Sequence, residues 1–455
     1  MKDATYLQLV GARILSEAND LKRDSHALAT ELRLDHATID QVIAGRATPE
    51  IVDEVICRMG EVYPIDETDL RILPDDCDSG IKIMRAEESR ATSRVFRRPD
   101  RNGNLEPYYE YRDTAFSRLS PFRPEWIREL RVVSDCNPDN PDVAFNHGHF
   151  LHQYSMYVGP VNHYWEVDGQ RYAIEMTTGD SSYTTPFRPH TFTSRSATER
   201  ALILAVTFGG NVRRAQRELY ALGTRAEHYL LDQATTTAAT KSLVRQYLHD
   251  AALTVERLDT ELRHAGATLT ARDAVEGDRP LDAHDLDHLA ATLGVSVRDL
   301  HVPVFDDSEE VIVEHTGVDD GYPYPASTDH RYTIRPMIRT AKMPAMRGFT
   351  ARVTTPDTDL TGGFTSSLHS WIYNYGNHAA RLCWSDGTGE RQTVVEPDDS
   401  LYIQPFVTHA FSRADSEPAD LCVVRVAGHV SGDTQRELSH FPSISRVVRE
   451  DRRWF

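Results

Sequence analysis

The sequence has few cysteines and no long apolar run, and both shortages exclude classes of protein. Its five cysteines are scattered, with no Cys-x-x-Cys pair, so neither a disulfide framework nor a zinc cluster is expected. No stretch of about 18 apolar residues occurs, which argues against a membrane-spanning helix. The N-terminal residues also lack the basic and apolar regions of a secretory signal. We therefore expect a cytoplasmic protein with no membrane partner.

An excess of basic residues is missing as well. The chain has 69 acidic and 50 basic residues, which gives a formal net charge of −19 at pH 7. A field of this sign repels polyanions, so nucleic acid is not expected as a partner. A small anion in a locally basic pocket is not excluded. With 455 residues, of which 40% are apolar, the chain is long enough for roughly three or four compact domains.

Two textures alternate along the chain. Residues 1–75 and 216–303 place apolar side chains at helical spacing, which predicts two helical domains. Residues 76–215 and 304–455 instead contain short alternating and β-branched runs between Gly, Pro, Asp and Asn turns, which predicts many short strands. The order of a helical domain followed by a strand-rich domain thus occurs twice.

A short internal similarity supports a duplication. The segment PFRPHTFTSR begins at Pro186 and PFVTHAFSR begins at Pro405, and both place a His, a Phe and a Ser-Arg pair at matching positions. Duplication of one helical-plus-strand unit is the simplest explanation.

The helical domains have the size and spacing of helix-turn-helix bundles. Such a bundle either inserts a recognition helix into DNA or packs as a cap on a neighbouring domain. The acidic balance and the lack of a basic stripe favour the packing role.

The strongest local pattern is His147-x-His149-x3-Gln153, followed later by His190. In a β-strand alternate side chains share a face, so we expect residues 147, 149, 151 and 153 to point the same way. Two imidazoles and one oxygen donor leave open positions on a six-coordinate metal ion. A lone histidine is more often structural, but the combination of His149, Gln153 and His190 predicts a metal site.

This pattern resembles the cupin barrels, which carry H-x-H-x3-E and a further His about forty residues later. The resemblance implies an α+β fold in which a small helix-turn-helix-like domain plus a cupin β-barrel is duplicated. The first barrel (76–215) then carries the metal. In the second barrel (304–455), His409 is retained, but Ser366 and Ser370 stand near the other ligand positions. We therefore expect a degenerate second barrel without a metal.

At these residues the chain is similar to the phosphonate-biosynthesis dioxygenases, namely hydroxyethylphosphonate dioxygenase and methylphosphonate synthase. The resemblance spans essentially the whole chain. It implies a cytoplasmic homo-oligomer, a dimer or a tetramer, that uses Fe(II) and O2 to cleave the carbon–carbon bond of 2-hydroxyethylphosphonate. In this family the dioxygenase makes hydroxymethylphosphonate and formate, and the synthase makes methylphosphonate and CO2.

The third metal ligand favours the synthase. The dioxygenase places a Glu six residues before its second His, and that position is Thr184 here, followed by Thr185. Neither can replace a carboxylate. The synthase instead has a Gln four residues after its first His, which corresponds to Gln153.

The resemblance also implies a phosphonate-binding set. Asn146 matches the family's amide, Tyr111 its tyrosine hydroxyl, and Arg101 its arginine, with Arg98 as the alternative. Lys22 matches a helical-domain lysine that reaches the phosphonate of a neighbouring subunit. A guanidinium, an ammonium and neutral donors suit a dianion.

Two alternative functions stay open. The first is the dioxygenase itself, or an epoxidase-like relative that acts on a hydroxypropyl phosphonate. The second belongs to another class: a DNA-binding transcriptional regulator whose barrel senses a small molecule. The regulator requires a basic recognition helix and no redox metal, and the sequence favours neither.

Overall fold

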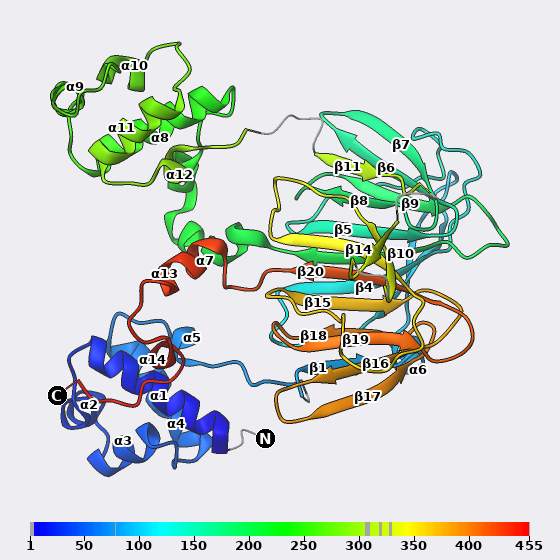
Figure 1. Cartoon of the computed structure of the whole chain (residues 1–455), viewed down its shortest axis with the longest axis horizontal. Coiled ribbons are helices and arrows are strands. Elements are labelled where there is room, and N and C mark those ends of the chain that lie inside the picture. Colours follow the sequence, from blue (N-terminus) through cyan, green and yellow to red (C-terminus); the bar gives the residue numbers. More distant parts are fainter. Residues whose placement is uncertain (1–3, 78, 305–309, 318–320, 327–329, 455) are drawn as a thin grey trace.

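The computed structural model describes residues 4–77, 79–304, 310–317, 321–326 and 330–454. Two groups of helices lie on one side of the molecule and the β-sheets lie on the other (Figure 1). Within the described ranges, no helix is both long and apolar enough to cross a membrane. The structure confirms the predicted α+β class and shows two large antiparallel sheets, as a duplicated unit requires.

The first helical group contains α1 (Ala4–Asp20), α2 (Ser25–Leu32), α3 (His36–Ile43), α4 (Pro49–Val62) and α5 (Glu67–Leu70). Asp24 caps α2, because its side chain accepts a hydrogen bond from Ala27 N. Pro49 occupies the first turn of α4, where no backbone donor is needed. The apolar positions of these helices form one buried core that includes Ile14 and Val55.

The second helical group repeats this plan with α8 (Thr236–Asp250), α9 (Val255–His264), α10 (Ala271–Val275), α11 (Ala283–Leu293) and α12 (Val297–Leu300). Threonine side chains cap the first three of these helices, at Thr235, Thr254 and Thr270. The helix α7 (Gly210–Leu222) and the 3-10 turn η1 (Gly223–Tyr229) precede the group.

The first β unit consists of two sheets that enclose an apolar core. The seven-stranded sheet contains, in spatial order, β11 (Val311–Glu314), β8 (Ser181–Thr184), β5 (His152–Val158), β10 (Leu202–Phe208), β4 (Phe122–Glu129), β3 (Leu105–Asp113) and β2 (Arg94–Pro99). The three-stranded sheet contains β7 (Gln170–Met176), β6 (Val161–Val167) and β9 (His190–Ser194).

The second β unit has the same strand order. Its larger sheet contains β1 (Ile81–Met84), β18 (Ser400–Ile403), β15 (His369–Asn374), β20 (Ala419–Val426), β14 (Met346–Val353), β13 (Tyr332–Pro336) and β12 (Tyr322–Tyr324). Its smaller sheet contains β17 (Glu390–Val395), β16 (Ala380–Ser385) and β19 (Thr408–Arg413). The short helix α6 (Ala86–Ala91) follows β1, and α13 (Gly432–Leu438) and α14 (Ile444–Val448) follow β20.

Each β unit takes its edge strand from the other half of the chain, which the sequence did not predict. The strand β1 pairs with β18, and β11 pairs with β8. A buried aspartate holds the segment that follows each exchanged strand. Asp180 accepts a hydrogen bond from Thr316 N, and Asp399 accepts one from Ala86 N, both at 2.9 Å. The two units are therefore fastened to each other by backbone pairing as well as by packing.

Alternate side chains of the large sheets serve two different cores. In the first sheet, Ile127 and Ile203 point between the two sheets of their own unit. Trp126 and Tyr154 point the other way and pack against Trp371 of the second unit. Both faces of β10 are thus buried, with Ile203 in one core and Leu204 in the other, which explains its near-continuous apolar sequence.

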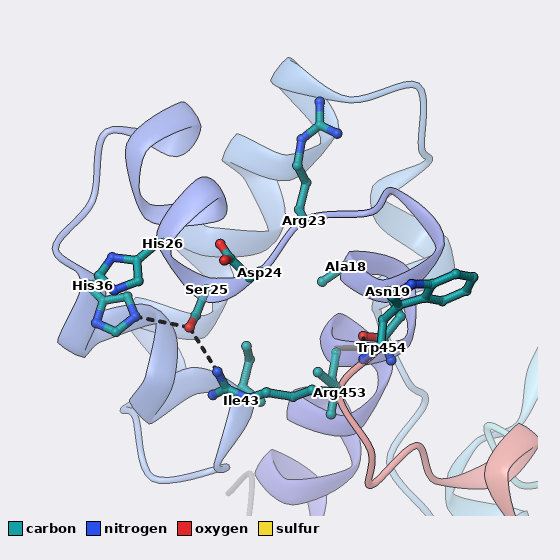
Figure 2. A pocket seen from close by; sticks show the side chains of 11 residues that line it. Ala18, Asn19, Arg23, Asp24, Ser25, His26, His36, Ile43, Arg453 and Trp454 are labelled. Atoms are coloured by element: carbon teal, nitrogen blue, oxygen red, sulfur yellow. Dashed lines mark hydrogen bonds between the residues drawn. The ribbon is translucent and has the colours of Figure 1, made fainter.

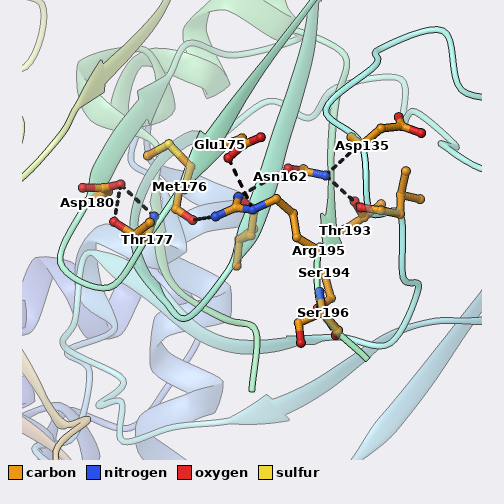
Figure 3. A network of polar contacts seen from close by, with 12 residues as sticks. Asp135, Asn162, Glu175, Met176, Thr177, Asp180, Thr193, Ser194, Arg195 and Ser196 are labelled. Atoms are coloured by element: carbon orange, nitrogen blue, oxygen red, sulfur yellow. Dashed lines mark hydrogen bonds and ion pairs between the residues drawn. The ribbon is translucent and has the colours of Figure 1, made fainter. Parts of the chain in front are cut away.

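Arg195 stabilises the smaller sheet of the first β unit (Figure 3). Its Nη1 donates to Val161 O at 2.5 Å, and its Nη2 donates to Met176 O at 2.9 Å. Glu175 forms an ion pair with the Arg195 guanidinium at 3.7 Å. These contacts join β6 and β7 to the end of β9, the strand that begins with His190.

The C-terminal segment returns to the first helical group (Figure 2). Asn19 binds its backbone twice, donating to Arg452 O at 2.8 Å and accepting from Trp454 N at 2.9 Å. Arg453 donates to Ser25 Oγ at 3.1 Å and pairs with Asp40 at 2.9 Å. Residues 452–454 are therefore part of the helical side of the molecule.

Candidate metal centre

A cavity of about 270 Å³ opens at one end of the first β unit, and the predicted metal ligands line it. The structure brings His149, Gln153 and His190 together there, with Tyr111 and Asn146. It adds lining residues that the sequence reading missed, among them Tyr109, Arg123, Glu125 and Thr207.

The strand that carries the first two candidate ligands is shorter than expected. The sequence predicted a strand from His147 to Gln153, but β5 begins at His152. Gly148 has a φ of +73°, and a Cβ there would meet the backbone of Phe187 at 2.4 Å. The chain therefore turns at Gly148. His149 reaches the cavity from a loop, whereas His147 is exposed and lies outside the cavity lining.

His149 and Gln153 present two acceptor atoms to each other. His149 Nδ1 donates to Leu151 O at 2.8 Å, so its Nε2 carries a lone pair. The Gln153 amide donates through Nε2 to Ser155 Oγ at 3.1 Å, which leaves Oε1 3.2 Å from His149 Nε2. Two lone pairs at this distance repel each other unless a cation lies between them, so the arrangement suits a metal ion.

His190 has the same tautomer. Its Nδ1 donates to Arg188 O at 2.8 Å, and Asn146 Nδ2 lies 3.2 Å from its Nε2. Burial lowers the pKa of His190 to about 4, so the ring is neutral, as a ligand must be. The rings of His149 and His190 are nearly perpendicular, with centroids 5.2 Å apart. A backbone carbonyl thus orients each imidazole, as is usual for metal-bound histidines.

The structure separates the two candidate arginines. Arg98 lines the cavity and donates to Ala144 O at 2.9 Å. Arg101 is not among the lining residues; its side chain is 55% exposed and binds Asp142 through Nε at 2.9 Å. The structure therefore places Arg98, the alternative, at the cavity in place of Arg101.

Lys22 lies far along the chain from the cavity lining, in the loop after α1. Its Nζ donates to Asn19 O and Asp20 O, and it lies 4.1 Å from the ring centroid of Trp454. Within one chain it does not line the metal cavity. A second cavity, also of about 270 Å³, is lined by neighbouring residues such as Asn19 and Arg23, and some of its side chains bond one another, such as Ser25 and His36 at 3.0 Å (Figure 2).

Two acidic side chains of β4 belong to the same interior. Glu125 lines the cavity, and burial raises its pKa. Glu129 lies deeper and is 4% exposed, and neither of its carboxyl oxygens has a hydrogen-bond partner among the described residues. Burial raises its pKa well above the usual range. No sequence motif marks either residue.

Comparison with known proteins identifies the family. No protein-family model matches the chain. The methylphosphonate synthase of Nitrosopumilus maritimus (strain SCM1) is 34% identical over 462 residues, covering 100% of this chain and 97% of that protein. The chain belongs to the methylphosphonate synthase family.

Solved structures of the same family extend the match. The hydroxyethylphosphonate dioxygenase of Streptomyces albus, solved with 2-hydroxyethylphosphonate and Fe(II) bound, is 32% identical. The two chains cover each other completely, with a TM-score of 0.88. A variant of 2-hydroxyethylphosphonate dioxygenase at 18% identity covers 95% of this chain, with a TM-score of 0.74, and shares the fold.

Proposed function

We propose that this member of the methylphosphonate synthase family converts 2-hydroxyethylphosphonate and O2 into methylphosphonate, CO2 and water in an Fe(II)-dependent reaction. The observation that carries the proposal is the donor set at the first β unit. It combines two imidazoles that each have Nδ1 bound to a backbone carbonyl with the amide oxygen of Gln153, on a chain 34% identical to a methylphosphonate synthase.

In this proposal His149, Gln153 and His190 hold the iron. These two nitrogen donors and one oxygen donor would leave other coordination positions of an iron ion open to substrate and O2. Bound Fe(II) supplies the one-electron chemistry with O2 that breaks the carbon–carbon bond. The chain itself fixes the tautomer of both imidazoles through the hydrogen bonds to Leu151 O and Arg188 O, which leave each Nε2 to bind the metal.

The phosphonate is held by residues at the same cavity. Arg98 offers a guanidinium, Tyr111 a hydroxyl and Asn146 an amide. A dianion gains most from the charged donor, since such hydrogen bonds are roughly twice as strong as neutral ones. Lys22 of a neighbouring subunit is proposed to add an ammonium, which requires a homo-oligomer.

The third ligand and the similarity to a methylphosphonate synthase support the product assignment. Thr184 is the direct cross-strand neighbour of Gln153 in the β5–β8 pairing, so the family's alternative Glu position faces the same point from the adjacent strand. Here that position holds a hydroxyl, and the neutral Gln supplies the oxygen. The 32% identity to a hydroxyethylphosphonate dioxygenase keeps hydroxymethylphosphonate and formate as the second candidate outcome.

We also propose the domain reading for this chain. The two β units act as cupin barrels, with residues 76–215 bearing the metal and 304–455 lacking it. The helical domains, 1–75 and 216–303, pack and assemble the molecule and do not read DNA. The enzyme is proposed to be cytoplasmic.

The test is turnover followed by phosphorus NMR. Protein reconstituted with Fe(II) under anaerobic conditions receives 2-hydroxyethylphosphonate and then O2. We expect a methylphosphonate signal that disappears in Gln153→Ala. A hydroxymethylphosphonate signal in its place would assign the dioxygenase reaction to the protein. No turnover by iron-loaded protein would overturn the assignment of 2-hydroxyethylphosphonate as the substrate.

A further inference from the structure

The second β unit contains a buried polar site at the position that corresponds to the metal cavity. Ser370 pairs with Arg425 in the β15–β20 ladder, and Gln153 pairs with Thr207 at the corresponding position of the β5–β10 ladder. Phe406 N donates to Ser366 O at 2.7 Å, as Phe187 N donates to His149 O at 2.8 Å. These pairings align the two sites residue by residue.

The corresponding histidine is His409. Its Nδ1 donates to Val407 O at 2.9 Å, which matches His190 and Arg188. Phe364 N donates to His409 O, as Asn146 N donates to His190 O in the first unit. A phenylalanine thus replaces Asn146 and offers no side-chain amide to the His409 ring. His409 is 1% exposed, and its Nε2, an acceptor in this tautomer, has no hydrogen-bond partner among the described residues.

Arg425 brings a positive charge into this site. Its guanidinium lies over the rings of Phe349 and Phe364, at 5.0 and 5.2 Å from their centroids. Its Nε and Nη2 are buried and have no hydrogen-bond partner among the described residues. Burial lowers the pKa of Arg425, and the Arg425 charge adds to the burial that lowers the pKa of His409. Both side chains lie against one ring, because the Phe364 centroid is 5.2 Å from the Arg425 guanidinium and 5.8 Å from the centroid of the His409 ring.

Burying a guanidinium without hydrogen-bond partners costs folding free energy. The N–H groups that lack partners show which ligand could bind there. The Nε and Nη2 atoms form the side of the guanidinium that grips two oxygens of one oxyanion. His409 Nε2 requires a donor. The site therefore offers two N–H groups and one acceptor.

We propose that Arg425 and His409 bind a small tetrahedral oxyanion that keeps one hydroxyl group, the monoanion of a phosphonate or of phosphate. Two of its oxygens accept from Arg425 Nε and Nη2, and its P–OH donates to His409 Nε2. A carboxylate satisfies the arginine but leaves the histidine without a donor. This site is independent of the proposed reaction, because it shares no side chain with the metal cavity.

The experiment measures methylphosphonate binding by titration calorimetry in mildly acidic buffer. The full chain carries His149→Ala and His190→Ala and is kept free of metal, so that iron-dependent binding in the first unit is removed. We expect one equivalent of methylphosphonate to bind. Arg425→Thr, which installs the first unit's residue, should abolish binding, and Arg425→Lys should weaken it at least about tenfold, because the two-pronged contact is lost. The exposed Arg352→Thr is the matched control and should bind normally.

Circular dichroism confirms that each variant is folded. Inorganic phosphate is the second probe: equal affinity would identify phosphate as a sufficient ligand, and a preference for methylphosphonate would assign the site to phosphonates. Formate should bind more weakly than either. The proposal would be overturned if the parent protein did not bind one equivalent of methylphosphonate or if Arg425→Thr still bound it. Tighter binding of formate than of methylphosphonate would also overturn it.

Discussion

The two β units share a scaffold but differ at the side chains that decide their chemistry. Both place a neutral histidine at the start of the corresponding strand, with Nδ1 bound to the carbonyl two residues earlier. Both turn through a left-handed phenylalanine, with φ of 64° at Phe187 and 65° at Phe406. The first unit surrounds its histidine with donors for a cation, whereas the second surrounds His409 with Arg425 and aromatic rings.

The comparison teaches that the proposed metal centre depends on few positions. His149, Gln153 and Thr207 of the first unit correspond to Ser366, Ser370 and Arg425 of the second. The hydrogen bonds that shape the backbone survive these replacements. The second unit keeps this scaffold but places the Arg425 guanidinium near the position of the proposed metal ion. A fixed side-chain cation thus stands where the first unit is proposed to bind Fe(II).

The largest effect should be the difference between two single variants, one at His190 and one at the equivalent His409. His190→Ala removes a proposed iron ligand, so we expect kcat/KM to fall by more than about 100-fold, beyond the usual cost of losing an outer partner of a metal. His409→Ala should leave turnover by folded protein unchanged. Turnover is measured by phosphorus NMR. An equal loss of kcat/KM in both variants would mean that the histidine of the first unit is not specifically required for turnover.

Copying the second unit into the first should exclude the metal. Thr207→Arg places a guanidinium beside Gln153, and two unit charges about 4 Å apart repel by about 4 kcal/mol near a protein surface. We expect Fe(II) to bind at least roughly 100-fold more weakly in anaerobic equilibrium dialysis. Thr207→Val is the control of similar size and should retain iron. Normal iron binding by Thr207→Arg would show that charge at this position does not distinguish the units.

A smaller effect should separate the two arginines of the β2–β3 hairpin. Arg98→Met removes a charged donor worth about 1.5–3 kcal/mol, so KM for 2-hydroxyethylphosphonate should rise roughly 10- to 100-fold. Arg101→Met should leave KM unchanged, because Arg101 contacts Asp142 outside the cavity. The opposite ranking would restore Arg101 as the phosphonate ligand.

The smallest effect concerns Glu129, whose equivalent in the second unit is Val353, since each pairs with a tyrosine of the adjacent strand. The pKa of Glu129 is raised in the folded state, so its contribution to stability is present below the unfolded pKa and is lost as pH rises through the folded pKa. Relative to Glu129→Gln, the wild type should lose up to about 1.4 kcal/mol for each pH unit in that window. Urea denaturation at several pH values measures the difference, and a difference that does not depend on pH would refute a neutral Glu129.

The sequence was sufficient to predict that His149, Gln153 and His190 meet, because the first two are close in sequence and the third begins a strand. Histidine and glutamine four residues apart stay together whether His149 belongs to a strand or, as observed, to a loop. Choosing between Arg98 and Arg101 was beyond the sequence, because the pairing of β2 with β3 shifts register between Phe96 and Arg97. Such an irregularity changes which residues face the interior and leaves no motif.

Long-range features were equally invisible. The exchange of β1 and β11 depends on which sheet edge each short strand meets in space. Glu129 and Arg425 are ionisable residues within strands, and their sequence contexts do not say whether they face solvent or an interior. Their burial is a property of the assembled sheets.

The most direct test of the account is the iron stoichiometry of the folded chain. Anaerobic dialysis against Fe(II) should load one iron per chain in the wild type and in His409→Ala. The variant carrying His149→Ala and His190→Ala should load none. Two irons per chain, or iron retained when both first-unit histidines are absent, would contradict a single metal centre in the first β unit.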